Sequence, residues 1–192
     1  MLLEYYTGRA YGLTGKVGLP LVPLVEVSPT PDTGSLRTAR AFASTTPCIA
    51  EIEAGVLLTA GVVCPKVTTT LAPGTSTSTA TVERTRIGLP GLPVIDVRGA
   101  TARSTSTCGS GGSATGSADV ELYIGGRRVP VGTEVNAEID LPGLARLVIN
   151  EQKPVAKADH GLTVNALHLT AAGGDTDIVV ASATSDVHNC AS

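Results

Sequence analysis

The four cysteines are the residues of this chain whose type and spacing point most directly to chemistry. They are Cys48, Cys64, Cys108 and Cys190, an even number without a Cys-x-x-Cys pair. A zinc site would need closely spaced pairs, so we expect no metal and instead two disulfides made in an oxidising compartment. Three pairings are possible. We favour Cys48–Cys64, which closes a local loop, and Cys108–Cys190, which ties the C-terminal end to the middle of the chain.

Carboxylates offer only weak catalytic signals. Glu51 and Glu53 share one face of an expected strand, about 7 Å apart, a separation that could suit a glycosidase pair. The chain has no tryptophan and one phenylalanine to stack a sugar, so a solvated face is the better reading. Asp175 and Asp177 are too few for the 6–8 oxygens of a calcium site and indicate a turn. The polar run at residues 150–152 indicates a hydrogen-bond network at a strand end.

The three histidines are not part of a catalytic motif. His160, His168 and His188 stand apart in the sequence, and His168 takes the polar position between Leu167 and Leu169. We expect it to be a surface or hydrogen-bonded strand residue. The sequence contains no Gly-x-Ser-x-Gly elbow, phosphate loop or dinucleotide fingerprint. We therefore expect a protein that is not an enzyme and needs no cofactor.

The elements that position these residues have the period of β-strands. Apolar and polar residues alternate at 135–141 and at 119–124, and Gly125-Gly126 after the latter predicts a hairpin turn. A change of phase near Ala166 predicts a bulge. The remaining expected strands are 5–13, 37–44, 49–63, 78–87, 94–106, 145–150 and 178–186. Many short strands with Gly/Pro turns predict an all-β, disulfide-linked antiparallel sandwich of roughly nine to ten strands.

Two segments differ from this pattern. Residues 101–118 are almost entirely Thr, Ser, Gly and Ala around Cys108, and we expect a mobile loop at 109–116. Prolines at 20, 23, 29 and 31 interrupt an apolar stretch, which excludes a central strand there. We therefore divide the chain into an extended segment or edge strand at 1–35, which binds a partner, and a sandwich domain at 36–192.

Three of the four tyrosines lie within the first eleven residues. Tyrosine and arginine are enriched at interface hot spots, because each combines a large contact area with a polar group. The simpler reading is that these tyrosines pack on the outside of the sandwich. The expected partner-binding residues are Leu2, Leu3, Tyr5, Tyr6, Arg9 and Tyr11. Deleting residues 2–11 is then expected to leave a folded sandwich that no longer binds its partner.

Charge and hydropathy exclude two classes of partner. The net charge is −3 and charged residues make up 16% of the chain, so no basic patch for nucleic acid is expected. No apolar run approaches the roughly 20 residues of a membrane helix. The first residues do not have the pattern of a signal peptide, which together with the disulfides fits a mature secreted chain.

Both ends of the chain resemble a known family. The segments are YTGRAYGL at 6–13, LVINEQ at 147–152, LTVNALHL at 162–169 and DIVVASATSDV at 177–187, followed by Cys190. They resemble the secreted actinobacterial choice-of-anchor P family, and this chain is similar to its unanchored form. Its size, secretion and tyrosine-rich start also resemble the B-component adaptors of Streptomyces umbrella toxin particles. That resemblance implies two protein partners, a lectin-like subunit and a large toxin-bearing subunit.

Three functions are therefore weighed. The first is a non-enzymatic adaptor in a secreted antibacterial complex. The second is a structural or surface-binding protein of the actinobacterial cell envelope. The third is a secreted hydrolase that uses Glu51 and Glu53, which the missing motifs disfavour.

Overall fold

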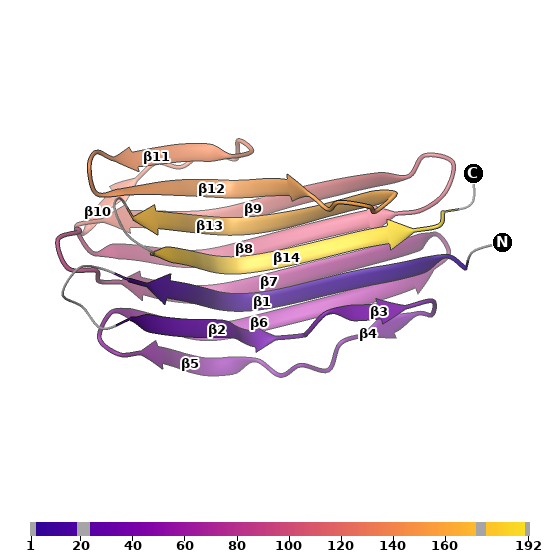
Figure 1. Cartoon of the computed structure of the whole chain (residues 1–192), viewed down its shortest axis with the longest axis horizontal. Helices are drawn as coiled ribbons and strands as arrows, with labels where there is room; N and C mark the ends of the chain where they lie inside the picture. Colours follow the sequence, from indigo (N-terminus) through magenta and orange to yellow (C-terminus); the bar gives the residue numbers. More distant parts are fainter. Residues whose placement is uncertain (1–2, 19–23, 172–175, 191–192) are drawn as a thin grey trace.

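The computed structural model describes residues 3–18, 24–171 and 176–190 and shows a sandwich of two antiparallel β-sheets (Figure 1). It contains fourteen strands, seven in each sheet. The number exceeds the expected nine to ten because short strands form where the chain passes from one sheet to the other. Within the described residues, no helix is long and apolar enough to cross a bilayer.

The first sheet, called sheet A, combines the two ends of the chain. Its order is β11-β12-β13-β14-β1-β2, and β3 also pairs with β1. The strands are β1 (Tyr5–Val17), β2 (Val25–Asp32), β3 (Leu36–Thr38), β11 (Ala137–Leu141), β12 (Ala145–Pro154), β13 (His160–Ala171) and β14 (Asp177–His188). The first and last long strands, β1 and β14, therefore lie side by side in the middle of this sheet.

The second sheet, called sheet B, is formed by the middle of the chain. Its order is β10-β9-β8-β7-β6-β4, and β5 also pairs with β6. The strands are β4 (Phe42–Ala43), β5 (Ile49–Ala54), β6 (Leu58–Leu71), β7 (Gly74–Ile87), β8 (Ile95–Thr107), β9 (Ser113–Ile124) and β10 (Arg127–Val129). Consecutive strands pair as hairpins from β6 to β10, as the period-two pattern and the Gly125-Gly126 turn predict.

The N-terminal segment is part of the sandwich rather than an arm beside it. β1 pairs with β14 over Tyr5–Lys16, and its other side pairs with β2 and β3. Pro29 and Pro31 lie in β2, which is an edge strand, as proline requires. A chain without residues 2–11 would lose half of a central strand, so the expectation that such a deletion leaves the sandwich folded is corrected.

The Ser/Thr-rich region also differs from expectation. Residues 101–107 complete β8, and β9 begins at Ser113, so most of the expected loop at 109–116 is paired strand. Only a tight turn remains, in which the Gly112 amide donates to the Gly109 carbonyl. Threonine is a strong β-former, and this preference outweighs the loop-like composition.

Several strands change phase at one transverse row. In sheet A the row contains Gly12, Ala166, Asn150 and Ala181, and the last two have positive φ of 50° and 53°. In sheet B it contains Val62 and Gly99, with φ of 42° and 57°, and Glu83 lies between them. The predicted phase change at Ala166 is therefore real. It leaves the β13 register intact, because the neighbouring strands change phase in the same row.

The row separates two halves of the core. On one side lie the large aliphatic side chains, which are fully buried: Leu13, Leu58, Ile87, Ile95, Leu122, Leu147, Ile149, Leu167, Leu169 and Ile178. On the other side, buried serines of sheet B donate directly to backbone carbonyls of sheet A. Ser76 bonds the Thr7 carbonyl at 2.6 Å, and Ser104 bonds the Leu162 carbonyl at 2.7 Å. The sheets are too close here for aromatic rings, which explains why the chain has so few.

Both favoured disulfides are present, Cys48–Cys64 and Cys108–Cys190. The first joins the segment that leads into β5 to β6. The second joins the β8–β9 turn to the end of β14, beside the buried side chains of Tyr6 and Val187. Each sheet end that carries a long connection is thus held by one covalent link.

Candidate functional site on the outer face of sheet A

The strand β1 places polar and aromatic side chains in a row on the outer face of sheet A. Tyr5, Thr7, Arg9 and Tyr11 alternate with buried residues and are partly exposed. We call these four residues the β1 row. Tyr6 points the other way, into the core, and is 3% exposed. The strand period therefore retains Tyr5, Arg9 and Tyr11 as candidate contact residues and removes Tyr6 from the expected set.

The other two expected contact residues lie at the start of the chain. Leu3 is 83% exposed, and Leu2 falls outside the described residues. Tyr6 has a structural role instead, because its hydroxyl hydrogen-bonds Glu4 near the Cys108–Cys190 disulfide. Burial, with a smaller contribution from the Glu4 carboxylate, raises the pKa of Tyr6 to about 12. Tyr6 thus anchors β1 in the core and does not present a surface.

Tyr5 is held between two partners from neighbouring strands. Its ring stacks on His188 of β14, with ring centroids 4.4 Å apart and an angle of 11° between the planes. The guanidinium of Arg37, on β3, lies 3.8 Å from the centroid of the same ring. Because β1 lies between β14 and β3, the three side chains form a layered stack. Aromatic and guanidinium groups fixed in this way lose little entropy on binding.

Hydrogen bonds fix the rest of the β1 row. Asp186 of β14 accepts from Thr7 and contacts the His188 ring nitrogen at 2.5 Å. Arg9 donates two hydrogen bonds to Asp32 of β2, at 3.1 and 2.7 Å. Burial alone would raise the pKa of Asp32, but the bonds from Arg9 and from the Gly34 amide lower it below its usual value. The carboxylate therefore stays ionised and keeps Arg9 in place.

A second polar cluster lies on the same face, across β12 and β13. The Glu151 carboxylate is 8% exposed and accepts from Asn165 at 2.7 Å and Lys153 at 2.8 Å; His168 Nδ1 lies 2.9 Å away. His168 Nε2 faces Asp177 at 3.2 Å. Burial raises the pKa of Glu151, but these hydrogen bonds outweigh it and lower the pKa below its usual value. The network expected at residues 150–152 therefore exists and extends to His168, as predicted for a hydrogen-bonded strand residue.

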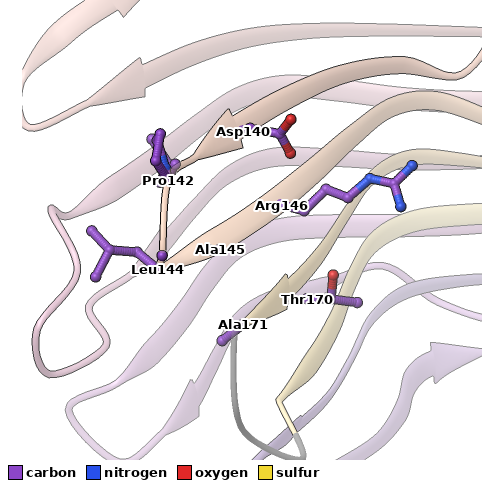
Figure 2. Close-up of a pocket in the computed structure, with 9 residues that line it drawn as sticks. Asp140, Pro142, Leu144, Ala145, Arg146, Thr170 and Ala171 are labelled. Atoms are coloured by element: carbon purple, nitrogen blue, oxygen red, sulfur yellow. The ribbon is translucent and has the colours of Figure 1, made fainter.

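Two shallow hollows adjoin this cluster. One, of about 380 Å³, is lined by Glu138, Arg146, Glu151, Lys153 and His168 among others. The next, of about 410 Å³, lies at the β11–β12 turn. Figure 2 shows Asp140, Arg146 and Thr170 on one side of this turn and Leu144 pointing away from it. Both hollows mix cations with carboxylates that are already paired, as in the Arg146–Glu138 bond. Neither contains a free nucleophile next to a base.

The remaining catalytic candidates do not converge. Glu51 and Glu53 lie exposed on β5, at the edge of sheet B. His160 begins β13 near the β8–β9 turn, whereas His188 belongs to the Tyr5 stack. Asp175 lies outside the described residues. Among the residues that the structure describes, no group of His, Cys, Asp and Glu could hold a metal ion.

Sequence reasoning identified the tyrosines but missed their partners. Arg37 and Asp32 lie far from β1 along the chain, and His188 lies at its other end, so only the sheet order brings them together. The phase of the strand could have separated Tyr6 from Tyr5, because Gly8 and Ala10 share the parity of Tyr6. No family model, no curated protein and no solved structure matches this chain.

Proposed function

We propose that this protein is a secreted, non-enzymatic adaptor that holds protein subunits together in an antibacterial toxin particle. By the resemblance of its ends to that class, the subunits would be a lectin-like protein and a large toxin-bearing protein. The observation that carries the proposal is the Tyr5 stack with its neighbours Arg9 and Tyr11. It offers aromatic rings and guanidinium groups that are already ordered, the composition found in interface hot spots.

Two features of the molecule support a secreted binding role. Its cysteines are paired in two disulfides, which persist in oxidising compartments. The face around the β1 row is built from bonded, mutually neutralised side chains rather than a cavity around a reactive group. Such a face suits recognition of another protein surface, because its polar groups are already oriented for contact.

The test uses the full chain, with an affinity tag, secreted and purified with its bound partners. Tyr5→Ala combined with Arg37→Ala removes the stack without touching the core. The matched control is Tyr123→Ala combined with Arg98→Ala, because Arg98 lies 4.3 Å from the Tyr123 ring on sheet B. We expect the first variant to lose at least one subunit and the control to keep both. Equal recovery by the two variants contradicts the proposed surface.

A structural protein of the cell envelope is the second candidate. One observation favours it: the outer face of sheet B carries rows of threonines, among them Thr68, Thr77 and Thr105, which adjoin a shallow hollow of about 310 Å³. A hydroxyl-rich, flat face suits contact with a polysaccharide wall. Size-exclusion of native culture supernatant separates the candidates. A large soluble particle supports the adaptor, and recovery with the wall fraction supports the envelope protein.

A further inference from the structure

The strand β9 has an edge that no other strand covers within the described part of the chain. β10 pairs only with Leu122, Tyr123 and Ile124, so residues 113–121 are unpaired on the side away from β8. In a strand, the N–H and C=O of alternate residues point to the same side. The Gly116 carbonyl points to the free side, because it accepts from the Gln152 amide at 3.1 Å. Ala114, Ala118 and Val120 share this parity.

The usual protections of an edge are sparse here. Proteins blunt open edges with proline, lysine, bulges or a covering segment. Residues 113–121 read SATGSADVE and contain neither proline nor lysine. The Gln152 side chain, which reaches across from β12, occupies only the Gly116 carbonyl. The backbone groups of Ala114, Ala118 and Val120 therefore remain available to an added strand.

A hollow lies where the covered part of β9 ends. It measures about 380 Å³ and is lined by Val120, Glu121, Arg128, Val129, Pro130 and Val131. Val120, Val129 and Val131 are half-buried residues that pack against the main core. A strand that continued the line of β10 along β9 would begin at this hollow. An apolar side chain at its first position would extend the core.

Charge defines a second feature of the occupant. Asp119 is exposed and has no ion-pair partner among the described residues, whereas Glu121 is paired with Arg128 at 3.2 Å. Opposite charges on directly facing residues of antiparallel strands stabilise the pair. The edge therefore favours a strand with a lysine or arginine opposite Asp119 and small or apolar residues on its inner face.

We propose that the open edge of β9 binds an extended segment of a partner protein by strand addition. The segment places an apolar side chain in the Val120–Val129–Val131 hollow and a cationic side chain opposite Asp119. The inference rests on the proposed adaptor function for the identity of the partner, and it supplies the second surface that an adaptor needs. Figure 1 shows β9 on the opposite side of the sandwich from β5, away from the β2 edge.

The experiment uses the purified full chain and two short fluorescein-labelled peptides of alternating valine and threonine. One peptide carries lysine opposite Asp119 and the other carries glutamate. We expect the wild-type chain to bind the lysine peptide about fivefold more tightly, the upper range for one cross-strand charge pair. Asp119→Lys should reverse the preference. Glu53→Lys, which changes an exposed carboxylate on the other edge of sheet B, is the matched control and should leave it unchanged.

A backbone test identifies the edge itself. Ala118→Pro removes one N–H that points to the free side, and proline is tolerated on an edge strand in that orientation. We expect it to abolish binding of both peptides while thermal stability stays near that of wild type. Amide exchange of Ala114, Ala118 and Val120 should slow when the lysine peptide is added. If Ala118→Pro does not fold, the exposed Asp119→Lys variant and the exchange measurement still decide.

Three outcomes overturn the proposal. One is equal affinity of the two peptides for both wild type and Asp119→Lys. Another is unchanged exchange at the β9 edge when the peptide is saturating. The third is dimerisation of the isolated chain that Ala118→Pro abolishes, which would assign the edge to a second copy. None of these measurements uses the Tyr5 stack or native subunits, so their failure is distinguishable from failure of the adaptor proposal.

Discussion

Val62 and Gly99 occupy the same transverse row of sheet B, and both adopt positive φ, 42° and 57°. Glycine takes this conformation at little cost, but a β-branched residue does so only under strain. The side chain of Val62 is 45% exposed, so it gains little burial in return. The row that divides the core is thus specified by Gly99 on β8 and imposed on Val62 by its neighbours.

The first prediction concerns this strain. Val62→Gly should stabilise the protein by about 1 kcal/mol, because relief of the strained φ exceeds the entropy cost of glycine. Gly99→Val should destabilise it by about 1–3 kcal/mol for the converse reason. Denaturant unfolding of both variants measures the difference. A Val62→Gly variant less stable than wild type would show that the row is not strained at this residue.

The second prediction concerns the serine-lined half of the core. Ser104→Ala loses hydrogen bonds to the Leu162 carbonyl and to Ser185, at a cost of about 1 kcal/mol. Ser104→Val should cost about 1–3 kcal/mol more, because the closely spaced sheets cannot admit the extra methyl groups. Thr105→Val, on the outward face of the same strand, is the control and should stay within about 0.5 kcal/mol of wild type. Similar stability of Ser104→Val and Ser104→Ala would contradict a narrow sandwich.

The third prediction concerns the buried carboxylate of Glu151. Because its folded pKa lies below the unfolded value of about 4.3, its contribution is complete above that value and disappears as the pH falls through the folded pKa. Glu151→Gln should therefore cost about 2 kcal/mol at pH 7 and very little near pH 2. Urea unfolding at several pH values tests this. A constant difference across the range would mean that the loss does not depend on ionisation.

The fourth prediction ranks the disulfides. They close segments with sequence separations of 16 for Cys48–Cys64 and 82 for Cys108–Cys190. Loop-closure entropy gives about 3 kcal/mol for the shorter and about 4.5 kcal/mol for the longer. Replacing each pair by alanine should therefore lower the melting temperature more for Cys108–Cys190. The reverse order would indicate that contacts near the cysteines, rather than the unfolded chain, decide the effect.

The fifth prediction separates two adjacent tyrosines. Tyr6→Ala should cost about 3–5 kcal/mol, because it removes a buried ring from the core. Tyr5→Ala should cost less than about 1 kcal/mol, because its ring is stacked on the surface. Thermal unfolding provides the comparison. It also shows whether Tyr5→Ala is a fair probe of subunit binding, since a variant that unfolds could not be interpreted.

Much of the fold follows from local pattern. Alternation predicts most of the long strands, and the cysteine spacing favours the disulfides that are found. Pattern fails where two strands far apart in sequence decide the outcome. Tyr5 to Tyr11 looked like a free arm because nothing local shows that β14, from the other end of the chain, pairs with this segment. The same long-range pairing brings His188 to Tyr5, so the candidate surface could not be assembled from the sequence.

The expected loop at 109–116 failed for a different reason. Glycine, serine and threonine suit flexible linkers, but they also suit a strand that must lie close to another sheet. A Cβ on Gly116 would lie 2.7 Å from Leu162 and 3.2 Å from the Gln152 amide carbon. The small residues thus reflect narrow spacing rather than mobility, a distinction that composition alone does not make.

The concentration of tyrosines on β1 gives the protein a built-in spectroscopic probe. With no tryptophan to dominate the emission, ultraviolet fluorescence comes from Tyr5, Tyr6, Tyr11 and Tyr123 alone. Three of these four fluorophores lie on one strand, one inside the core and two on the proposed contact face. Docking of a subunit that lacks fluorophores of its own could therefore be followed by quenching, without any attached label.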